Sequence, residues 1–283
     1  MEKTLRPNIV VFGAAGFVGH AIAQALKTDK QNVLELSRTE VDLLDKSSCE
    51  KIQHLVNDGD IVVLAFARAP ARNLDDIFEN VTMINNVLNS LRILDLSYVL
   101  NISSDAVYSD SKEPINENSS MAPTSAHGIM HCMRERLVDQ TFGSIAGHLR
   151  PTLIFGKDDP HNGYGPNSFL RKISAGEDII LFGKGEEMRD HIHIKDVAAV
   201  ATAMIKNQHL GGLNAVTGEV RSFHDIANSM VGVSNAKCKV LISQRDGPMP
   251  HDGYRAFDNS ALLRLLPDIN FSTVEDYLIG ESK

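Results

Sequence analysis

The stretch Val10-Val11-Phe12-Gly13-Ala14-Ala15-Gly16-Phe17-Val18-Gly19 decides the fold. The apolar run ending at Phe12 predicts a buried strand, and the alanine-rich segment after Gly16 has the periodicity of a helix. Gly13 permits a tight turn, Gly16 lets a phosphate approach the backbone, and Gly19 lets the helix pack on the strand. Free N–H groups at such a helix start bind anions, so the stretch predicts a dinucleotide site. One turn glycine with two packing glycines is the blander alternative.

Outward from this stretch, strands and helices alternate through the first half of the chain. Apolar runs separated by helices are typical of a parallel sheet with helices on both faces, a doubly wound α/β fold of the Rossmann type. We predict strands at residues 8–13, 32–37, 60–67, 98–103 and 144–150, and helices at 18–27, 46–57, 73–94 and 125–141.

The pattern loosens after residue 150. We expect helices at 168–175, 194–206 and 223–231, a loop at 156–166, a polar loop at 244–254 and a last helix at 259–266. The sequence therefore predicts a cofactor-binding domain over residues 1–150 and a smaller substrate lobe over 151–283, closing over the carboxyl ends of the strands.

Composition narrows the classes of function. The net charge of −8 over 283 residues argues against a nucleic-acid binder, which usually has a basic face. The three cysteines are far apart and form no metal-binding pair, which favours a reducing cytoplasm. No signal peptide and no membrane-spanning apolar run is evident, so we expect a cytoplasmic protein without a membrane partner.

The end of the second predicted strand indicates the cofactor. Where NAD-binding folds place an acidic residue for the ribose hydroxyl, this chain has Ser37 and Arg38. An arginine there suits a 2′-phosphate, so we expect NADP(H) in preference to NAD(H). Glu35 is expected to face the same side as Ser37, and a surface arginine is the alternative interpretation of Arg38.

The glycine stretch resembles the opening of the extended short-chain dehydrogenase/reductase family, which contains nucleotide-sugar epimerases, dehydratases and 4-ketoreductases. Further segments resemble the family's motifs in the family's order: Asp42-Leu43 and residues 64–67, 80–88, 102–108, 149–156 and 183–196. The link from Arg38 to Asp45 most resembles the branch of GDP-fucose synthases, which uses NADPH.

The resemblance implies a role for particular residues. The implied substrate contacts are Ser104, which would also be catalytic, with Asp105, Asn167, Arg189 and Arg255. The implied cofactor contacts are Gly13, Ala15, Gly16, Phe17, Val18, Gly19, Ser37, Arg38, Asp42, Leu43, Ala65, Phe66, Ala67, Asn80, Ser103, His131 and Pro151.

The sequence departs from the family at its Tyr-x-x-x-Lys pair, because the two positions hold His127 and His131. Imidazole titrates near neutral pH, so His127 can act as the proton donor while His131 positions the ribose. Alternatively, the chemistry is lost and the protein binds its ligands without turnover. A metal site is a third interpretation, but no third ligand is adjacent, so we expect no metal.

These observations together predict an NADP-dependent enzyme acting on a nucleotide-diphosphate sugar. We expect reduction of a 4-keto sugar, with epimerisation close behind and a silent cofactor-binding protein, a sensor or complex subunit, as the alternative from another class. The resemblance also implies a homodimer in which helices 73–94 and 125–141 pair, and surface-polysaccharide or secondary-metabolite sugar synthesis as the setting.

Overall fold

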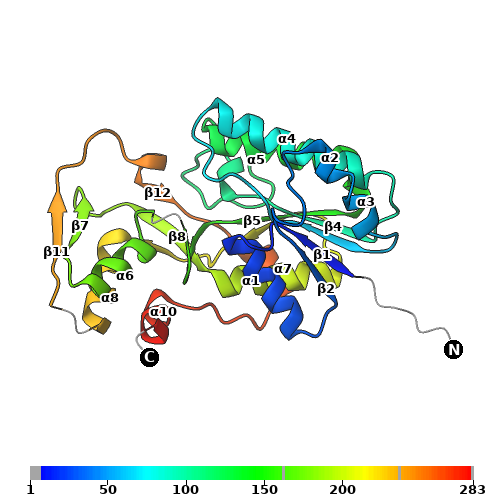
Figure 1. The fold of residues 1–283 in the computed structure, drawn as a ribbon. Coiled ribbons are helices and arrows are strands. Elements are labelled where there is room, and N and C mark those ends of the chain that lie inside the picture. The colour runs from blue at the N-terminus through cyan, green and yellow to red at the C-terminus, as the bar shows by residue number, and fades with distance from the viewer. Residues whose placement is uncertain (1–7, 161–162, 235–236, 282–283) are drawn as a thin grey trace. The chain divides into compact units, whose positions relative to one another are not determined.

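The computed structural model describes residues 8–160, 163–234 and 237–281 (Figure 1). The chain folds into two compact units: unit 1 comprises Met1–Ser109, Glu117–Pro151 and Val197–Asn214, and unit 2 comprises Asp110–Asn116, Thr152–Asp196 and Ala215–Lys283. Unit 1 thus includes residues 197–214 from the C-terminal half of the chain, and unit 2 includes residues 110–116 from the N-terminal half.

Within the described residues, unit 1 contains a six-stranded sheet in the order β2-β1-β3-β4-β5-β9. The pairs among β1 to β5 are all parallel. Figure 1 shows α2 to α5 on one face of this sheet and α1 and α7 on the other. This is the predicted doubly wound fold. The strands are β1 (Ile9–Phe12), β2 (Val33–Leu36), β3 (Ile61–Leu64), β4 (Tyr98–Ile102), β5 (Ala146–Pro151) and β9 (Gly211–Ala215).

The helices of unit 1 cover apolar strands that are buried on both faces. All residues of β1, β3 and β4 are buried, as near-continuous apolar runs predict for a parallel sheet. One core packs α4 and α5 against these strands through Ile84, Val87 and Val138. The helices are α1 (Phe17–Thr28), α2 (Lys46–Cys49), α3 (Ile52–Leu55), α4 (Leu74–Leu91), α5 (Ala126–Phe142) and α7 (Ile194–Asn207), with the 3-10 turns η1 (Asp105–Val107) and η2 (Gly143–Ile145).

Unit 2 is built on smaller sheets. In its described part, β8 (Met188–His193) pairs with β10 (Val220–Ser222), β12 (Tyr254–Arg255) and β6 (Leu153–Phe155), and β7 (Ile179–Phe182) pairs with β11 (Val240–Ser243). Its own core includes Phe155, Phe169 and Phe223. The helices are α6 (Pro166–Ala175), α8 (Phe223–Ser234), α9 (Ser260–Leu265) and α10 (Val274–Glu281), with the turn η3 (Pro250–Gly253). Residues 161 and 162 of the predicted loop lie outside the described residues.

Two predictions about helices were wrong. The helix expected over residues 46–57 is broken into α2 and α3. At the break the Lys51 amide donates to the Ser48 carbonyl, a tighter turn than that of an α-helix, and Ser90 Oγ donates to the Cys49 carbonyl. The helix near residue 260 is followed by another, α10, which buries Tyr277 and Leu278. Thr273 Oγ1 accepts from the Asp276 amide, and Asp276 accepts from the Thr273 amide, so a capping pair marks its start.

Candidate cofactor and catalytic site

The glycine turn of unit 1 has the geometry that its sequence requires. Gly13 follows β1 with a φ of +80°, and a Cβ there would lie 2.8 Å from the Ala65 carbonyl oxygen. A Cβ on Gly19 would lie 2.2 Å from the Gly13 carbonyl oxygen. A larger residue at Gly19 would therefore push α1 away from the turn, and the free amides at the start of α1 would no longer point toward the phosphate position.

A cavity of about 450 Å³ in unit 1 opens beside this turn. The predicted cofactor residues that line it are Gly13, Ala15, Gly16, Ser37, Arg38, Asp42, Leu43, Ala65, Phe66 and Ala67. Sequence reasoning missed Phe12, Leu36, Val41, Leu44, Arg68, Glu79 and Met83. Phe17, Val18, Gly19, Asn80, Ser103, His131 and Pro151 are absent from the residues found to line it in the described chain. The cavity and its glycine cradle fit a dinucleotide.

The turn after β2 places the Glu40 carboxylate against Ser37, where the 2′-phosphate was expected. Glu40 accepts from the Ser37 amide at 2.9 Å and from the Ser37 hydroxyl at 2.5 Å. These hydrogen bonds lower the pKa of Glu40 to about 2. Arg38 lies 3.3 Å from Asp42 and its side chain is 78% exposed. The Glu35 carboxylate instead forms an ion pair with Lys27 of α1, with 2.7 Å between Oε1 and Nζ.

Asn80, which was predicted to touch the cofactor, fastens the lining of the cavity. Its side chain is fully buried. Its Oδ1 accepts from the Arg68 amide, and its Nδ2 donates to the carbonyls of Arg68 and Asp76. Asn80 thereby fixes the backbone of Arg68, a residue that lines the cavity. This is a positioning role.

The two histidines lie together at the start of α5. The ring centroids of His127 and His131 are 4.6 Å apart and nearly perpendicular. His127 Nδ1 lies 3.4 Å from the Ala71 amide, which donates to it. Burial above all, then the charges on His127 and Arg134, lower the pKa of His131 well below 6.5. His131 is therefore neutral at neutral pH, and its buried Nδ1 makes no hydrogen bond to any described residue.

Close packing brings α5 to the turn that carries Ser104. A Cβ on Gly128 would lie 2.1 Å from the Ala106 carbonyl oxygen, so the helix and η1 touch backbone to backbone. Ser104 caps η1 by accepting from the Ala106 amide at 3.1 Å, and its hydroxyl lies 3.3 Å from Asp105. The structure therefore sets the histidine pair beside the Ser104 segment.

Sequence reasoning missed a buried cation next to this pair. The Arg134 side chain is fully buried and its guanidinium lies 4.7 Å from the centre of the Phe66 ring, which lines the cavity. Burial lowers the pKa of Arg134 to about 10, so the side chain keeps its charge at neutral pH. No local signal indicated this burial, because the partners Asn101 and Phe66 lie far from Arg134 in the sequence.

A chain of hydrogen bonds holds this cation. Arg134 Nη2 donates to Asn101 Oδ1 at 3.2 Å, and Asn101 Nδ2 lies 3.2 Å from His148 Nδ1. His148 Nε2 lies 2.8 Å from Asp139. The chain links the buried charge to a carboxylate at the surface of α5 through the side chains of Asn101 and His148, and bonded groups in such a chain polarise one another.

The predicted substrate residues of unit 2 all have partners within the protein. Arg255 stands opposite Arg189 in the parallel pairing of β12 with β8, so the structure brings these two together. Arg189 pairs with Glu187, and Arg255 pairs with Asp110 at 3.0 Å. Asn167, at the start of α6, accepts from the Gly156 amide and donates to Asp159.

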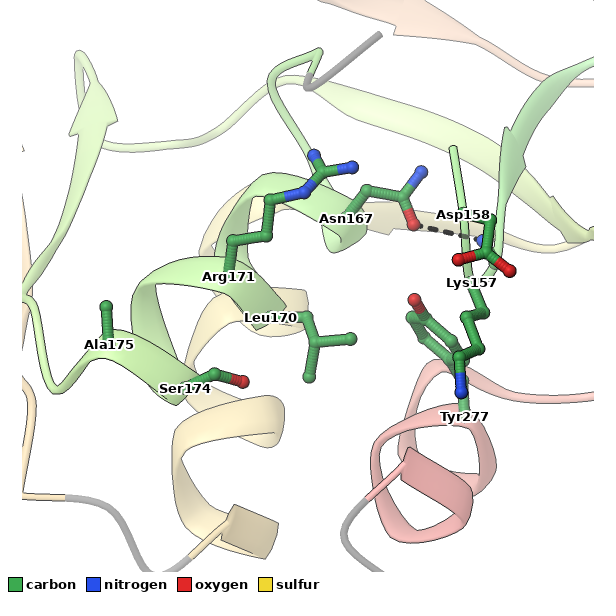
Figure 2. Close-up of a pocket in the computed structure, with 9 residues that line it drawn as sticks. Lys157, Asp158, Asn167, Leu170, Arg171, Ser174, Ala175 and Tyr277 are labelled. Atoms are coloured by element: carbon green, nitrogen blue, oxygen red, sulfur yellow. Dashed lines mark hydrogen bonds between the residues drawn. The ribbon is translucent and has the colours of Figure 1, made fainter. Parts of the chain in front are cut away.

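Asn167 also lines a second cavity, of about 440 Å³, within unit 2 (Figure 2). Figure 2 shows Arg171 and Leu170 reaching toward it from α6, with Lys157 and Tyr277 on the opposite side. No other predicted site residue is among its described lining residues, and its polar side chains come from the loop after β6, from α6 and from α10.

Three buried histidines predict acid lability. Burial is the main cause that holds the pKa of His131 well below 6.5 and lowers those of His191 to about 3 and His193 to about 4. The unfolded chain binds these protons near its ordinary pKa, so their stabilisation is complete above 6.5 and is lost as the pH falls. We expect the unfolding free energy to fall by about 1 kcal/mol per group for the first pH unit below that value.

Urea denaturation at about pH 7.5, 6 and 5 measures this loss. His193→Gln is the informative variant, because it should make the pH dependence shallower whatever it does to stability at pH 7.5. A free energy that stays constant from pH 7.5 to 5 contradicts the prediction.

The described residues offer neither a metal cluster nor a membrane-spanning helix. No group of three or more histidine, cysteine, aspartate and glutamate side chains in the described chain has the arrangement of a metal site. No described helix is long and apolar enough to cross a membrane.

The parallel sheet, the glycine cradle and the adjoining cavity define a dinucleotide-binding protein of the Rossmann type. The model of the NAD dependent epimerase/dehydratase family matches residues 9–215. The chain therefore belongs to that family, and the resemblance found in its sequence is confirmed.

Relatives with assigned reactions fall in the same group. GDP-L-fucose synthase of Escherichia coli is 24% identical over 282 residues, covering 86% of each protein. dTDP-4-dehydro-6-deoxy-D-allose reductase of a Streptomyces species is 24% identical over 263 residues, covering 80% of this chain and 81% of the relative. UDP-glucose 4-epimerase of Thermus thermophilus, solved with NAD, has a TM-score of 0.82 at 20% identity, over 96% of this chain and 98% of that one.

Proposed function

We propose that the protein is an NADP-dependent oxidoreductase that reduces the 4-keto group of a nucleotide-diphosphate sugar. The observation that carries the proposal is the contact of Gly128 with Ala106, which sets the histidine pair beside Ser104 in the same unit as the cofactor cavity. The dTDP-4-dehydro-6-deoxy-D-allose reductase among the relatives supports the direction of the reaction, and the UDP-glucose 4-epimerase keeps epimerisation as a close second.

The chemistry divides between the cofactor and the chain. NADPH, when bound, supplies a hydride. The Ser104 hydroxyl would donate a hydrogen bond to the substrate carbonyl oxygen, where negative charge develops. The protonated ring of His127 would give a proton to that oxygen as the general acid and would be left neutral, the form in which its Nδ1 can accept from the Ala71 amide. Because His131 is neutral and its buried Nδ1 bonds no residue in the described part of the chain, that nitrogen is suited to bond the cofactor's ribose.

The nicotinamide absorbance tests the proposal. NADPH, and separately NADH, is mixed with the protein and with UDP-, GDP- and dTDP-linked 4-keto-6-deoxy sugars. Oxidation of NADPH by at least one of these substrates is the expected result. Tight binding of NADPH with no oxidation across the panel contradicts the reductase and favours an epimerase or a silent protein.

A catalytically silent binding protein is the second candidate function. The observation that favours it is the neutrality of His131, which supplies no fixed charge near the cofactor, together with the internal ion pairs of Arg189 and Arg255. In that case the cofactor would bind at the cavity with ordinary affinity, and no sugar nucleotide would change its absorbance.

Arg38 is predicted to set the preference for NADP. Its exposed guanidinium can pair with a 2′-phosphate, and a charge-assisted pair of this kind is stronger than a neutral hydrogen bond. We expect Arg38→Ala to weaken NADPH binding about tenfold and to leave NADH binding unchanged. Quenching of nicotinamide fluorescence during titration measures both affinities. Arg92→Ala, which removes an exposed arginine outside the cavity lining, is the control, and equal losses for both cofactors would contradict the assignment.

A homodimer through α4 and α5 is part of the proposal. The two helices pack side by side, and their outer surface exposes Leu74 by 63%, Phe78 by 59% and Ile129 by 47%. Exposed apolar side chains of this size are typical of a surface that another chain covers. Light scattering measures the mass in solution, and the mass of a monomer would contradict the proposed dimer.

A further inference from the structure

Two arginines stand side by side in unit 2, and each has a carboxylate. The parallel register of β12 with β8 pairs Arg255 with Arg189, so the two side chains leave the sheet on the same face. Like charges at this separation repel unless anions compensate them. Glu187 lies against Arg189 and Asp110 lies 3.0 Å from Arg255. The two arginines therefore form an anion-binding site that the carboxylates of Glu187 and Asp110 occupy.

The two carboxylates differ in how firmly they are held. The Glu187 side chain is only 9% exposed, and its partner Arg189 also donates to the Pro250 carbonyl at 2.6 Å. The Asp110 side chain is 57% exposed, and it lies in a short segment that belongs to unit 2 apart from the chain around it. An exposed ion pair contributes little to stability, whereas a buried pair is costly to break. Asp110 is therefore the carboxylate that another anion can replace.

Arg255 is buried behind the more exposed Asp110. The Arg255 side chain is 3% exposed, and its guanidinium also lies over the Phe257 ring. An anion that binds Nη1 of this guanidinium would take the position that the Asp110 carboxylate now fills, 3.0 Å away. A phosphate carries more charge than a carboxylate and binds a guanidinium through two oxygens, so it can win that exchange.

The neighbouring turn is tied to the same carboxylate. His251 in η3 contacts Asp110 through its Nδ1. His251 and Asp252 have φ values of 53° and 51°, in the left-handed region that non-glycine residues rarely adopt. Such backbone persists where surrounding contacts enforce it. Release of Asp110 would remove one of the contacts that enforce it.

We propose that Asp110 is an internal counter-ion that competes with the diphosphate of the substrate for Arg255. Asp110 holds the guanidinium in place when no substrate is bound, and the incoming diphosphate displaces it. The inference rests on the proposed function, because it takes the ligand of Arg255 to be a nucleoside diphosphate group. Asp110 is thus a specificity-determining residue that lowers the affinity for every ligand too weakly charged to displace it.

Calorimetric titration of UDP, GDP and dTDP into the purified protein tests the inference. Asp110→Asn keeps the size of the side chain and removes its charge, so it should tighten binding of the preferred nucleotide about five- to tenfold. Asp252→Asn is the matched control, since it removes an exposed carboxylate from the adjacent turn and asparagine tolerates the left-handed backbone. We expect the control to stay within about twofold of the parent.

The possible results distinguish failure of the Asp110 counter-ion from failure of the proposed function. Unchanged or weaker binding by Asp110→Asn, with a parent protein that binds, overturns the counter-ion and leaves the proposed function standing. Equal tightening by both variants also overturns it, because general repulsion would then suffice. If the parent and both variants bind none of the three nucleotides, the proposed function fails and the inference fails with it.

Discussion

Gly19→Ala is expected to abolish cofactor binding and to destabilise unit 1. The added Cβ would meet the Gly13 carbonyl oxygen at 2.2 Å, which is backbone that cannot turn aside. Helix α1 would have to move away from β1, and the amides at its start would leave the phosphate position. We expect a loss of about 2–4 kcal/mol in unfolding free energy and at least a hundredfold loss in NADPH affinity.

Gly232→Ala is the matched control. Gly232 lies in α8, and a Cβ there would meet nothing within 4 Å. In a helix interior, alanine is favoured over glycine by about 0.5–1 kcal/mol, so the control should be neutral or slightly stabilised. Urea denaturation and fluorescence titration of both variants provide the comparison. A Gly19→Ala protein that binds NADPH like the parent would show that the glycine turn does not hold the cofactor.

His127→Phe is expected to lower kcat by two to four orders of magnitude while NADPH binding stays within about threefold of the parent. Phenylalanine preserves the ring that packs at 4.6 Å against His131, and it removes the proton that we assign to the reaction. The separation of kcat from cofactor affinity is the essential result. A change in packing would affect both, whereas loss of a proton donor affects the chemical step.

Two further variants make this prediction sharp. His54→Phe removes an exposed histidine on α3 and should leave kcat unchanged. The double change His127→Tyr with His131→Lys introduces the pair of the wider family. If the protein works with histidines, the double change should lower or alter its activity. Activity that arises only in the double variant would identify the parent as a silent relative.

The fold of unit 1 was predictable from local sequence because each element carries its own signal. The apolar runs at β1, β3 and β4 are buried on both faces. Such strands are nearly continuous in apolar residues, without the alternation of apolar and polar residues that marks a half-exposed sheet. The break between α2 and α3 was not predictable in this way. At the break Ser90 Oγ donates to the Cys49 carbonyl, and this contact between residues distant in sequence forms only in the folded chain.

The candidate site was predictable where backbone shape decides it. Gly13 and Gly19 lie where a Cβ would collide with backbone, so their spacing alone indicates the cradle. Side chains that depend on a distant partner were beyond sequence reasoning. Arg134 appears as an ordinary helical arginine until Asn101 and Phe66 are placed against it, and Asp110 as a surface acid until Arg255 is beside it.

Transfer of deuterium from NADPH labelled at both C4 positions to the sugar tests the central claim most directly. The protein is incubated with the labelled cofactor and the panel of nucleotide 4-keto sugars, and mass spectrometry measures the masses of the sugar products. Our account predicts a reduced sugar that carries one deuterium, formed by the parent and lost in His127→Phe. A protein that binds the cofactor yet returns every sugar unreduced and without deuterium would contradict it.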